Sequence, residues 1–99
     1  MLRVNIMINN ETGLHARPAA LFAQTAQQFK SKVTISHAGN HGDAKSVLNI
    51  LGLGICKGTE ILVEADGVDE RDALKALQNL VESNFTNTQF LVNDPGRKE

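Results

Sequence analysis

The sequence predicts an α+β fold in which a four-stranded antiparallel sheet carries three helices on one face, in the order βαββαβα. Apolar and polar residues alternate in residues 2–8, 32–36 and 60–66, which is the period of a strand buried on one side. Apolar residues recur every three or four positions in residues 16–29 and 69–81, which is the period of a helix with one buried face. Strands and helices that each bury a single face fit a two-layer sandwich.

The first predicted strand is followed by a break and then by a helix. The buried face of this strand is expected to hold Leu2, Val4, Ile6 and Ile8. Residues 11–13 end the strand. The helix expected over residues 16–29 has Pro18 in its first turn, where the missing N–H costs little. Its buried stripe is expected to comprise Ala19, Phe22 or Ala23, Ala26 and Phe29.

A hairpin and a short helix are expected next. The second strand, over residues 32–36, should point Val33 and Ile35 into the core. Residues 37–40 have the composition of a turn, and a short polar strand should follow them to residue 43. Ser46 is the expected N-cap of a helix over residues 46–53, because a serine oxygen accepts a hydrogen bond from a first-turn N–H. Gly52 or Gly54 should end that helix.

The last strand and the last helix complete the predicted order. A fourth strand over residues 60–66 is expected to bury Ile61, Val63 and Ala65. Gly67 ends this strand, and Asp69 is expected to cap the third helix. The core stripe of that helix is expected to be Ala73, Leu74, Leu77, Leu80 and Val81.

Composition excludes several classes of protein. The chain has 99 residues, ten basic and eleven acidic side chains and four aromatic residues, so we expect one domain and no nucleic-acid partner. Cys56 is the only cysteine, which excludes an internal disulfide and a thiolate zinc site, and we expect it to be buried. No signal peptide or apolar run of about 18 residues is present, so we expect a cytoplasmic protein without membrane insertion.

Residues 13–18 carry the groups best suited to chemistry. His15 stands at a helix start, where the exposed N–H groups act like about half a positive charge and favour an attached phosphoryl group. Pro18 has no N–H, so the backbone amides that can donate hydrogen bonds to a phosphoryl group are those of Ala16 and Arg17. The guanidinium of Arg17 can give paired hydrogen bonds to phosphoryl oxygens. These residues alone leave open a histidine that merely caps the helix beside a solvent-facing arginine.

The stretch from residue 13 to residue 22 resembles the active-site motif of the HPr family, the histidine-containing phosphocarriers of the bacterial phosphotransferase system. The resemblance continues in residues 44–49, 51–54, 57–58 and 72–74 and covers about residues 1–85. It implies an open-faced β-sandwich with three helices on one side, which agrees with the periodicities. We therefore expect an HPr-like domain over residues 1–88 and a C-terminal tail over residues 89–99.

The resemblance also implies a function. An enzyme I-like protein charged by phosphoenolpyruvate would donate a phosphoryl group to Nδ1 of His15, Arg17 would stabilise that group, and an enzyme IIA-like protein would accept it. The chain would be a monomeric carrier and not an enzyme, without cofactor or metal, in the sugar or the nitrogen-related branch. Partners would dock on Ala16, Ala20, Gln24, Val47, Leu48 and Leu51.

Ser46 has two interpretations. It matches the residue that a dedicated kinase phosphorylates in HPr of many Gram-positive bacteria, which would add a serine kinase or phosphatase as a partner. It is equally explained as a helix cap, and Asn49 departs from the small residue of the kinase-regulated pattern. The alternative function is a non-catalytic regulatory binding module controlled by phosphorylation at Ser46. HPr-like relatives that regulate without carrying can lack the active-site histidine, so His15 together with Arg17 favours carrying.

Overall fold

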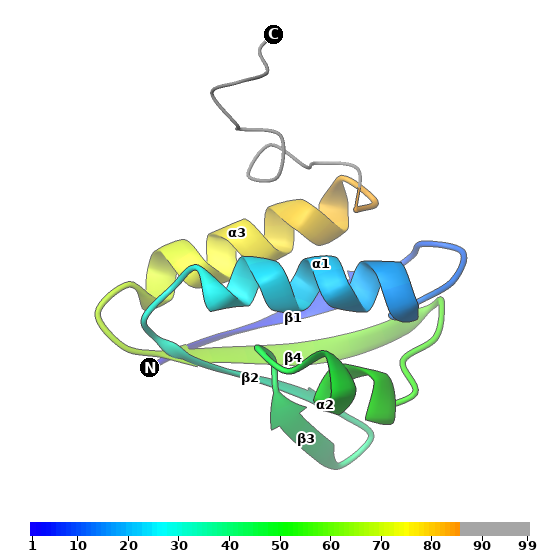
Figure 1. The fold of residues 1–99 in the computed structure, drawn as a ribbon, viewed down its shortest axis with the longest axis horizontal. Helices are drawn as coiled ribbons and strands as arrows, with labels where there is room; N and C mark the ends of the chain where they lie inside the picture. The colour runs from blue at the N-terminus through cyan, green and yellow to red at the C-terminus, as the bar shows by residue number, and fades with distance from the viewer. Residues whose placement is uncertain (86–99) are drawn as a thin grey trace, which may run out of the picture.

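The structure, a computed structural model, describes residues 1–85; residues 86–88 of the expected domain and the expected tail, residues 89–99, lie outside the described residues. The described chain has the predicted element order (Figure 1). Its elements are β1 (Leu2–Ile8), α1 (Ala16–Gln27), β2 (Lys32–His37), β3 (Asn40–Asp43), α2 (Val47–Gly52), β4 (Thr59–Asp66) and α3 (Glu70–Glu82).

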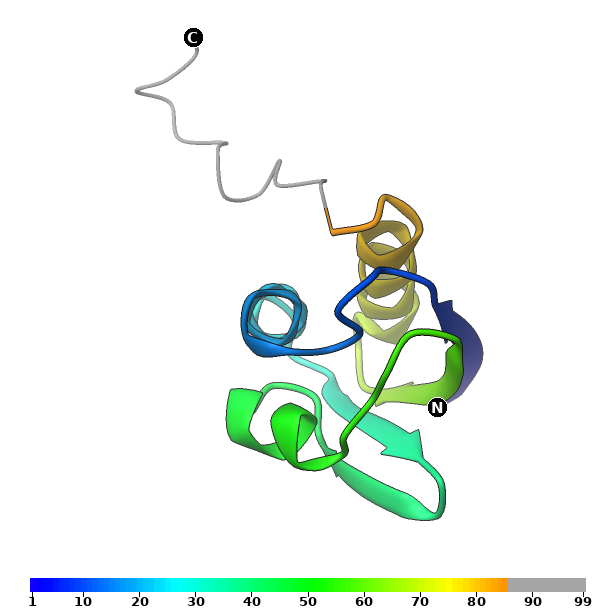
Figure 2. The same cartoon turned by 90° about the vertical axis from the view of Figure 1, so that its right-hand side faces the viewer.

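The four strands form one antiparallel sheet in the order β1-β4-β2-β3. All three helices lie on the same face of this sheet (Figure 2). The predicted fold class is therefore confirmed. The register brings Val63 of β4 opposite Val4 of β1 and Ile35 of β2. Strands that alternate in sequence thus align their apolar residues toward the helices.

The core fills the space between the sheet and the helices. Ile6 and Ile8 of β1 are buried, whereas Leu2 and Val4 near its start are only half-buried. Phe22 and Ala23 were alternatives for the stripe of α1, and both are fully buried. The expected buried residues of β2, β4 and α3 are all in the core. Each of these strands and helices buries only one face, which explains why the strand and helix periods could be recognised in the sequence.

Helix α1 is shorter than expected. It ends at Gln27, and the next two amides bond three residues back, Gln28 to the carbonyl of Thr25 and Phe29 to that of Ala26. This tightening turns the chain toward β2, so that Phe29 packs against the core from the loop. The hairpin is tighter than expected as well, because β2 and β3 extend to His37 and Asn40 and leave only two residues in the turn.

Asp69 does not cap α3 with its side chain, which corrects the prediction. It occupies the N-cap position, but its carboxylate accepts hydrogen bonds from the amides of Lys30 and Ser31, at 2.8 and 2.9 Å, and from the Ser31 hydroxyl, at 2.5 Å. These bonds tie the start of α3 to the loop between α1 and β2. The Ser31 hydroxyl and the Lys30 amide lower the pKa of Asp69 to about 2 from its ordinary 3.8.

We call the hydrogen bonds of the Asp69 carboxylate to Lys30 and Ser31 the Asp69 clamp. We expect its contribution to the free energy of unfolding to be lost in acid. Because the pKa of Asp69 is lower in the folded chain, its contribution is fully present above pH about 4 and is lost as pH falls toward about 2. We expect Asp69→Asn to flatten the dependence of the free energy of unfolding on pH in this window. Urea unfolding at a series of pH values measures it.

The control for the clamp is Ser31→Ala, which removes the largest cause of the shift. This variant should raise the pKa of Asp69 and move the acid transition upward. Some pH dependence should remain in Asp69→Asn, since the amide of Gly67 also lowers the pKa of Glu70. A wild-type pH profile in Asp69→Asn would refute the clamp.

Candidate functional site

His15 lies at the N-cap position of α1, directly before the first helical residue. Its backbone is extended, with φ −88° and ψ −165°, and its carbonyl accepts a hydrogen bond from the amide of Ala19 at 2.7 Å. Its side chain is exposed and makes no capping hydrogen bond. His15 therefore occupies the cap position of α1, but its imidazole makes no capping hydrogen bond.

The loop before His15 holds it in this position. Gly13 has φ +62°, and a Cβ atom there would lie 2.8 Å from Cα of Cys56 and even closer to the carbonyl oxygen of Ile55, so only glycine fits. The amide of Leu14 donates to that Ile55 carbonyl at 3.0 Å, and the Leu14 side chain is 2% exposed. Gly13 and Leu14 are buried against the core, and His15, the next residue, faces solvent.

Asn10 supports the loop from inside. Its Nδ2 donates to the carbonyl of Gly13 at 2.7 Å, and the amide of Gly13 donates back to the Asn10 carbonyl at 3.1 Å. Asn10 is 8% exposed. Sequence reasoning did not find this residue, because a single asparagine at the end of a strand carries no recognisable signal.

The first turn of α1 offers two hydrogen-bond donors beside His15. Within residues 1–85, the amides of Ala16 and Arg17 have no acceptor, because the first intrahelical bonds begin later and Pro18 has no N–H. The N-terminal end of the helix also carries partial positive charge. This helix start can therefore hold an anionic group next to the imidazole.

Arg17 adds a positive charge to the same turn, and this charge is not paired with a carboxylate within residues 1–85. Its side chain is exposed and forms no ion pair with any other residue of 1–85. It also lines a hollow of about 370 Å³ between the start of α1 and the end of α3. An arginine that forms no ion pair breaks none when it binds an anion.

Helix α2 lies beside α1 and presents apolar side chains to solvent (Figure 1). Leu48 is 79% exposed and Leu51 is 39% exposed, whereas Ile50 is fully buried and anchors the helix. A hydrogen bond of 2.8 Å from Gln27 Nε2 of α1 to the carbonyl of Lys45 joins the two helices. The expected partner-binding residues thus divide between two adjacent helices.

We call this the α1–α2 surface, defined by Ala16, Ala20, Gln24, Val47, Leu48 and Leu51. On α1 its members are four residues apart and follow one side of the helix from His15 onward. Ala16 and Gln24 are exposed and Ala20 is half-buried; on α2, Val47 is half-buried. The structure therefore brings the expected residues onto helices that are in contact.

Ser46 is the N-cap of α2, as predicted. Its hydroxyl oxygen accepts hydrogen bonds from the amide of Asn49 at 3.2 Å and from Asn49 Nδ2 at 3.1 Å. The Oδ1 of the same asparagine accepts from the amide of Asp43 at 3.0 Å. Asn49 therefore ties the cap of α2 to β3, which gives a structural reason for the departure from the smaller residue.

Cys56 is exposed, which corrects the expectation that it would be buried. Its loop crosses the backbone of Gly13, and the neighbouring Ile55 takes the buried place in the core. Within residues 1–85, no three His, Cys, Asp or Glu side chains gather as metal ligands would. None of the helices in that part of the chain has the length and apolar character needed to cross a membrane.

The fold and this site define a small α+β domain that exposes a histidine at a helix start, beside two helix amides that have no acceptor within residues 1–85. A sequence model described as "PTS HPr component phosphorylation site" matches residues 2–83. The phosphocarrier protein HPr of Neisseria meningitidis serogroup A is 42% identical over 85 residues, which cover 86% of this chain and 96% of that protein. The chain therefore belongs to the HPr family of phosphocarrier proteins of the phosphotransferase system.

Solved structures agree with this assignment. HPr-C-His from Thermoanaerobacter tengcongensis superposes with a TM-score of 0.84 at 47% identity, covering 86% of this chain and 96% of that chain. The HPr dimer from the same organism has a TM-score of 0.71 at 46% identity and covers 88% of this chain and 100% of that chain. The fold and the family are thus supported by sequence and by structure.

Proposed function

We propose that the chain accepts a phosphoryl group on His15 from an enzyme I-like protein charged by phosphoenolpyruvate and passes it to an enzyme IIA-like protein. The observation that carries this proposal is the exposed imidazole of His15 next to the unfilled amides of Ala16 and Arg17. Membership of the HPr family supports it.

The proposed reaction needs few groups from this chain. Nδ1 of His15 forms a bond to phosphorus while the bond from phosphorus to the donor breaks, and the second transfer reverses these roles. The amides of α1 and the Arg17 guanidinium would stabilise the charge on the phosphoryl oxygens. The partner proteins would supply in-line positioning. The chain thus acts as a carrier and not as an enzyme, and this role requires no cofactor or metal.

Labelling with phosphoenolpyruvate tests this function. The chain, incubated with phosphoenolpyruvate and an enzyme I, should gain one phosphoryl group that is lost in acid and stable in base, as phosphohistidine is. Mass spectrometry of the intact protein counts the groups, and peptide mapping locates them. A label that survives acid, or that maps away from His15, would contradict the proposal.

We propose the α1–α2 surface as the docking site for both partners. Leu48→Asp should weaken the complex with enzyme I by about tenfold or more, because burying one leucine is worth about 1.5–3 kcal/mol and a buried charge costs further energy. Titration calorimetry or the dependence of the transfer rate on enzyme I concentration measures it.

The matched control for Leu48 is Val68→Asp. Val68 is 87% exposed and lies two residues before α3, and the start of α3 is at the opposite end of the molecule from the start of α1 (Figure 1). Its substitution should leave binding unchanged. Equal losses in both variants would mean that added negative charge, and not the α1–α2 surface, weakens the complex.

Ser46 is proposed as a regulatory position beside this surface. Its hydroxyl is half-buried as a cap, and a negative charge there would lie next to Val47 and Leu48 while suiting the helix N-terminus. A kinase and a phosphatase would then be further partners. The full alternative, a regulatory module that does not carry, is less supported because His15 and Arg17 are both available.

Two variants separate capping from regulation at Ser46. Ser46→Asp keeps a capping oxygen, so the free energy of unfolding should change by less than about 1 kcal/mol, while phosphorylation of His15 should slow. Ser46→Ala should lose about 1 kcal/mol of stability and transfer at the wild-type rate. Melting curves and initial transfer rates measure both. Wild-type transfer in Ser46→Asp would leave Ser46 as a cap alone.

One of the similar solved structures is an HPr dimer, whereas we expect this chain to be a monomer. The monomeric state and the cytoplasmic location both stay predictions for this chain. Sedimentation at several concentrations tests the first.

A further inference from the structure

The peptide group between Gly13 and Leu14, which leads into His15, is hydrogen-bonded at both of its polar atoms. The Gly13 carbonyl accepts from Asn10 Nδ2 at 2.7 Å, and the Leu14 amide donates to the carbonyl of Ile55 at 3.0 Å. The two bonds come from different segments of the chain, the end of β1 and the loop before β4. They fix the plane of this peptide group, and with it the direction in which the backbone enters residue 15.

The bond from Asn10 to Gly13 is shielded from water. Asn10 is 8% exposed, and a hydrogen bond in such surroundings is electrostatically stronger than one in water. The backbone carbonyl of Asn10 also accepts from the Gly13 amide at 3.1 Å. Asn10 therefore holds the turn over residues 10–13 through its backbone and through its side chain.

The side chain of Asn10 acts as a donor in this turn. Because a carbonyl oxygen can only accept, the group that faces the Gly13 carbonyl must be the Nδ2 amide. The Oδ1 atom of Asn10 is buried and accepts from no residue of 1–85. A leucine of similar shape at this position would therefore remove the donor without removing an accepted bond.

We propose that Asn10 is a positioning residue for phosphoryl transfer at His15, an inference that rests on the carrier function proposed above. In-line transfer requires the attacking nitrogen at a narrow range of distances and angles from phosphorus. The His15 imidazole is exposed and makes no capping hydrogen bond, so the backbone that carries it sets its position. The bond from Asn10 restricts that backbone before the partner binds, and its loss lowers the fraction of complexes with an aligned imidazole.

Transfer from phosphoenolpyruvate-charged enzyme I to Asn10→Leu tests this role. We expect the maximal transfer rate to fall about tenfold, because the nucleophile is aligned less often. The enzyme I concentration that gives half of this rate should stay unchanged, because Asn10 is not part of the α1–α2 surface. Rapid-quench kinetics measures both quantities, and a melting curve establishes that the variant is folded at the assay temperature. Asn10→Ala, which also lacks the donor, should behave alike.

Amide hydrogen exchange, followed by NMR, gives a second readout that does not involve phosphorylation. The Leu14 amide should exchange about tenfold faster in Asn10→Leu, because its peptide group is then held at one atom only. The Phe22 amide in the middle of α1 should exchange at the wild-type rate. A general loss of stability would instead speed the exchange of both amides, which would contradict a local role for Asn10.

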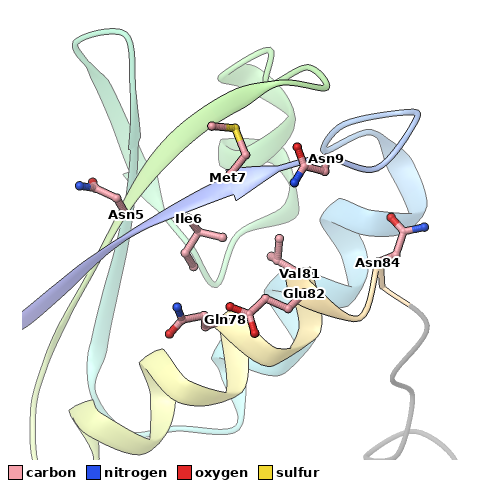
Figure 3. A pocket seen from close by; sticks show the side chains of 8 residues that line it. All are labelled: Asn5, Ile6, Met7, Asn9, Gln78, Val81, Glu82 and Asn84. Atoms are coloured by element: carbon pink, nitrogen blue, oxygen red, sulfur yellow. The ribbon is translucent and has the colours of Figure 1, made fainter.

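The matched control is Asn9→Leu. Asn9 is the adjacent asparagine, but it is exposed and lines a hollow of about 480 Å³ between β1 and α3 (Figure 3). The same substitution there should leave the transfer rate and the exchange of the Leu14 amide at their wild-type values.

Two results would overturn the positioning role while leaving the carrier function intact. One is a wild-type maximal rate in Asn10→Leu, and the other is equal slowing in Asn9→Leu and Asn10→Leu. A change confined to the half-saturating enzyme I concentration would make Asn10 a docking residue and would also overturn the role. A wild-type chain that takes up no phosphoryl group on His15 would overturn the carrier function, and the positioning role with it.

Discussion

The His15→Ala variant is expected to take up no phosphoryl group from phosphoenolpyruvate and enzyme I. The side chain removed is the proposed nucleophile, and the rest of the site can bind a phosphoryl group but cannot form a bond to it. Stability should change by less than about 0.5 kcal/mol, because the imidazole is exposed and makes no capping hydrogen bond. Intact-protein mass spectrometry and a melting curve measure the two effects.

The remaining two histidines are the controls for His15. His37 and His41 lie in the β2–β3 hairpin, where neither stands at a helix start. His37→Ala and His41→Ala should therefore be labelled like the wild-type chain. Acid-labile labelling that persists in His15→Ala would assign the phosphoryl group to another residue.

Arg17→Ala should slow phosphoryl transfer by roughly ten- to hundredfold, because one hydrogen bond to a charged group is worth about 1.5–3 kcal/mol. Arg17→Lys should recover part of the rate, since the charge remains but the paired geometry does not. The free energy of unfolding should stay unchanged in both, because Arg17 forms no ion pair within residues 1–85. Rapid-quench measurement of transfer gives the rates.

The control for Arg17 is Arg71→Ala. Arg71 is also an exposed arginine in the first turn of a helix, but the start of α3 lies at the opposite end of the molecule from the start of α1 (Figure 1). Its removal changes the net charge equally, so it should leave the transfer rate at the wild-type value. Similar slowing in both variants would indicate long-range attraction of partners and not contact with the phosphoryl group.

The elements could be predicted from the sequence because each buries only one face. Three of the four strands showed a period of two, and α1 and α3 showed a helical period. Boundaries were less predictable. Phe29 continues the helical spacing of α1, yet α1 ends at Gln27, because the chain must turn there to enter β2.

Individual side-chain roles were predictable only where the partner is close in sequence. Ser46 caps α2 through an amide three residues away, and it was found. Asp69 is a residue type that commonly caps helices, but its partners Lys30 and Ser31 are 39 and 38 residues away, and no local pattern indicates a contact over that separation. Cys56 was expected inside because free cysteine is commonly buried, but its loop places Ile55 inward.

The sequence by itself determined the element order, the cap of α2 and the position of His15 at a helix start, because these depend on local periodicity and on groups a few residues apart. Only the tertiary structure decided the strand order β1-β4-β2-β3, the contact of α1 with α2 and the close approach of Gly13 to the Ile55–Cys56 backbone. These features join segments distant in the chain, and hydrophobic burial, which drives them, is non-directional. The same one-sided pattern fits several topologies, and the packing of the whole core selects one of them.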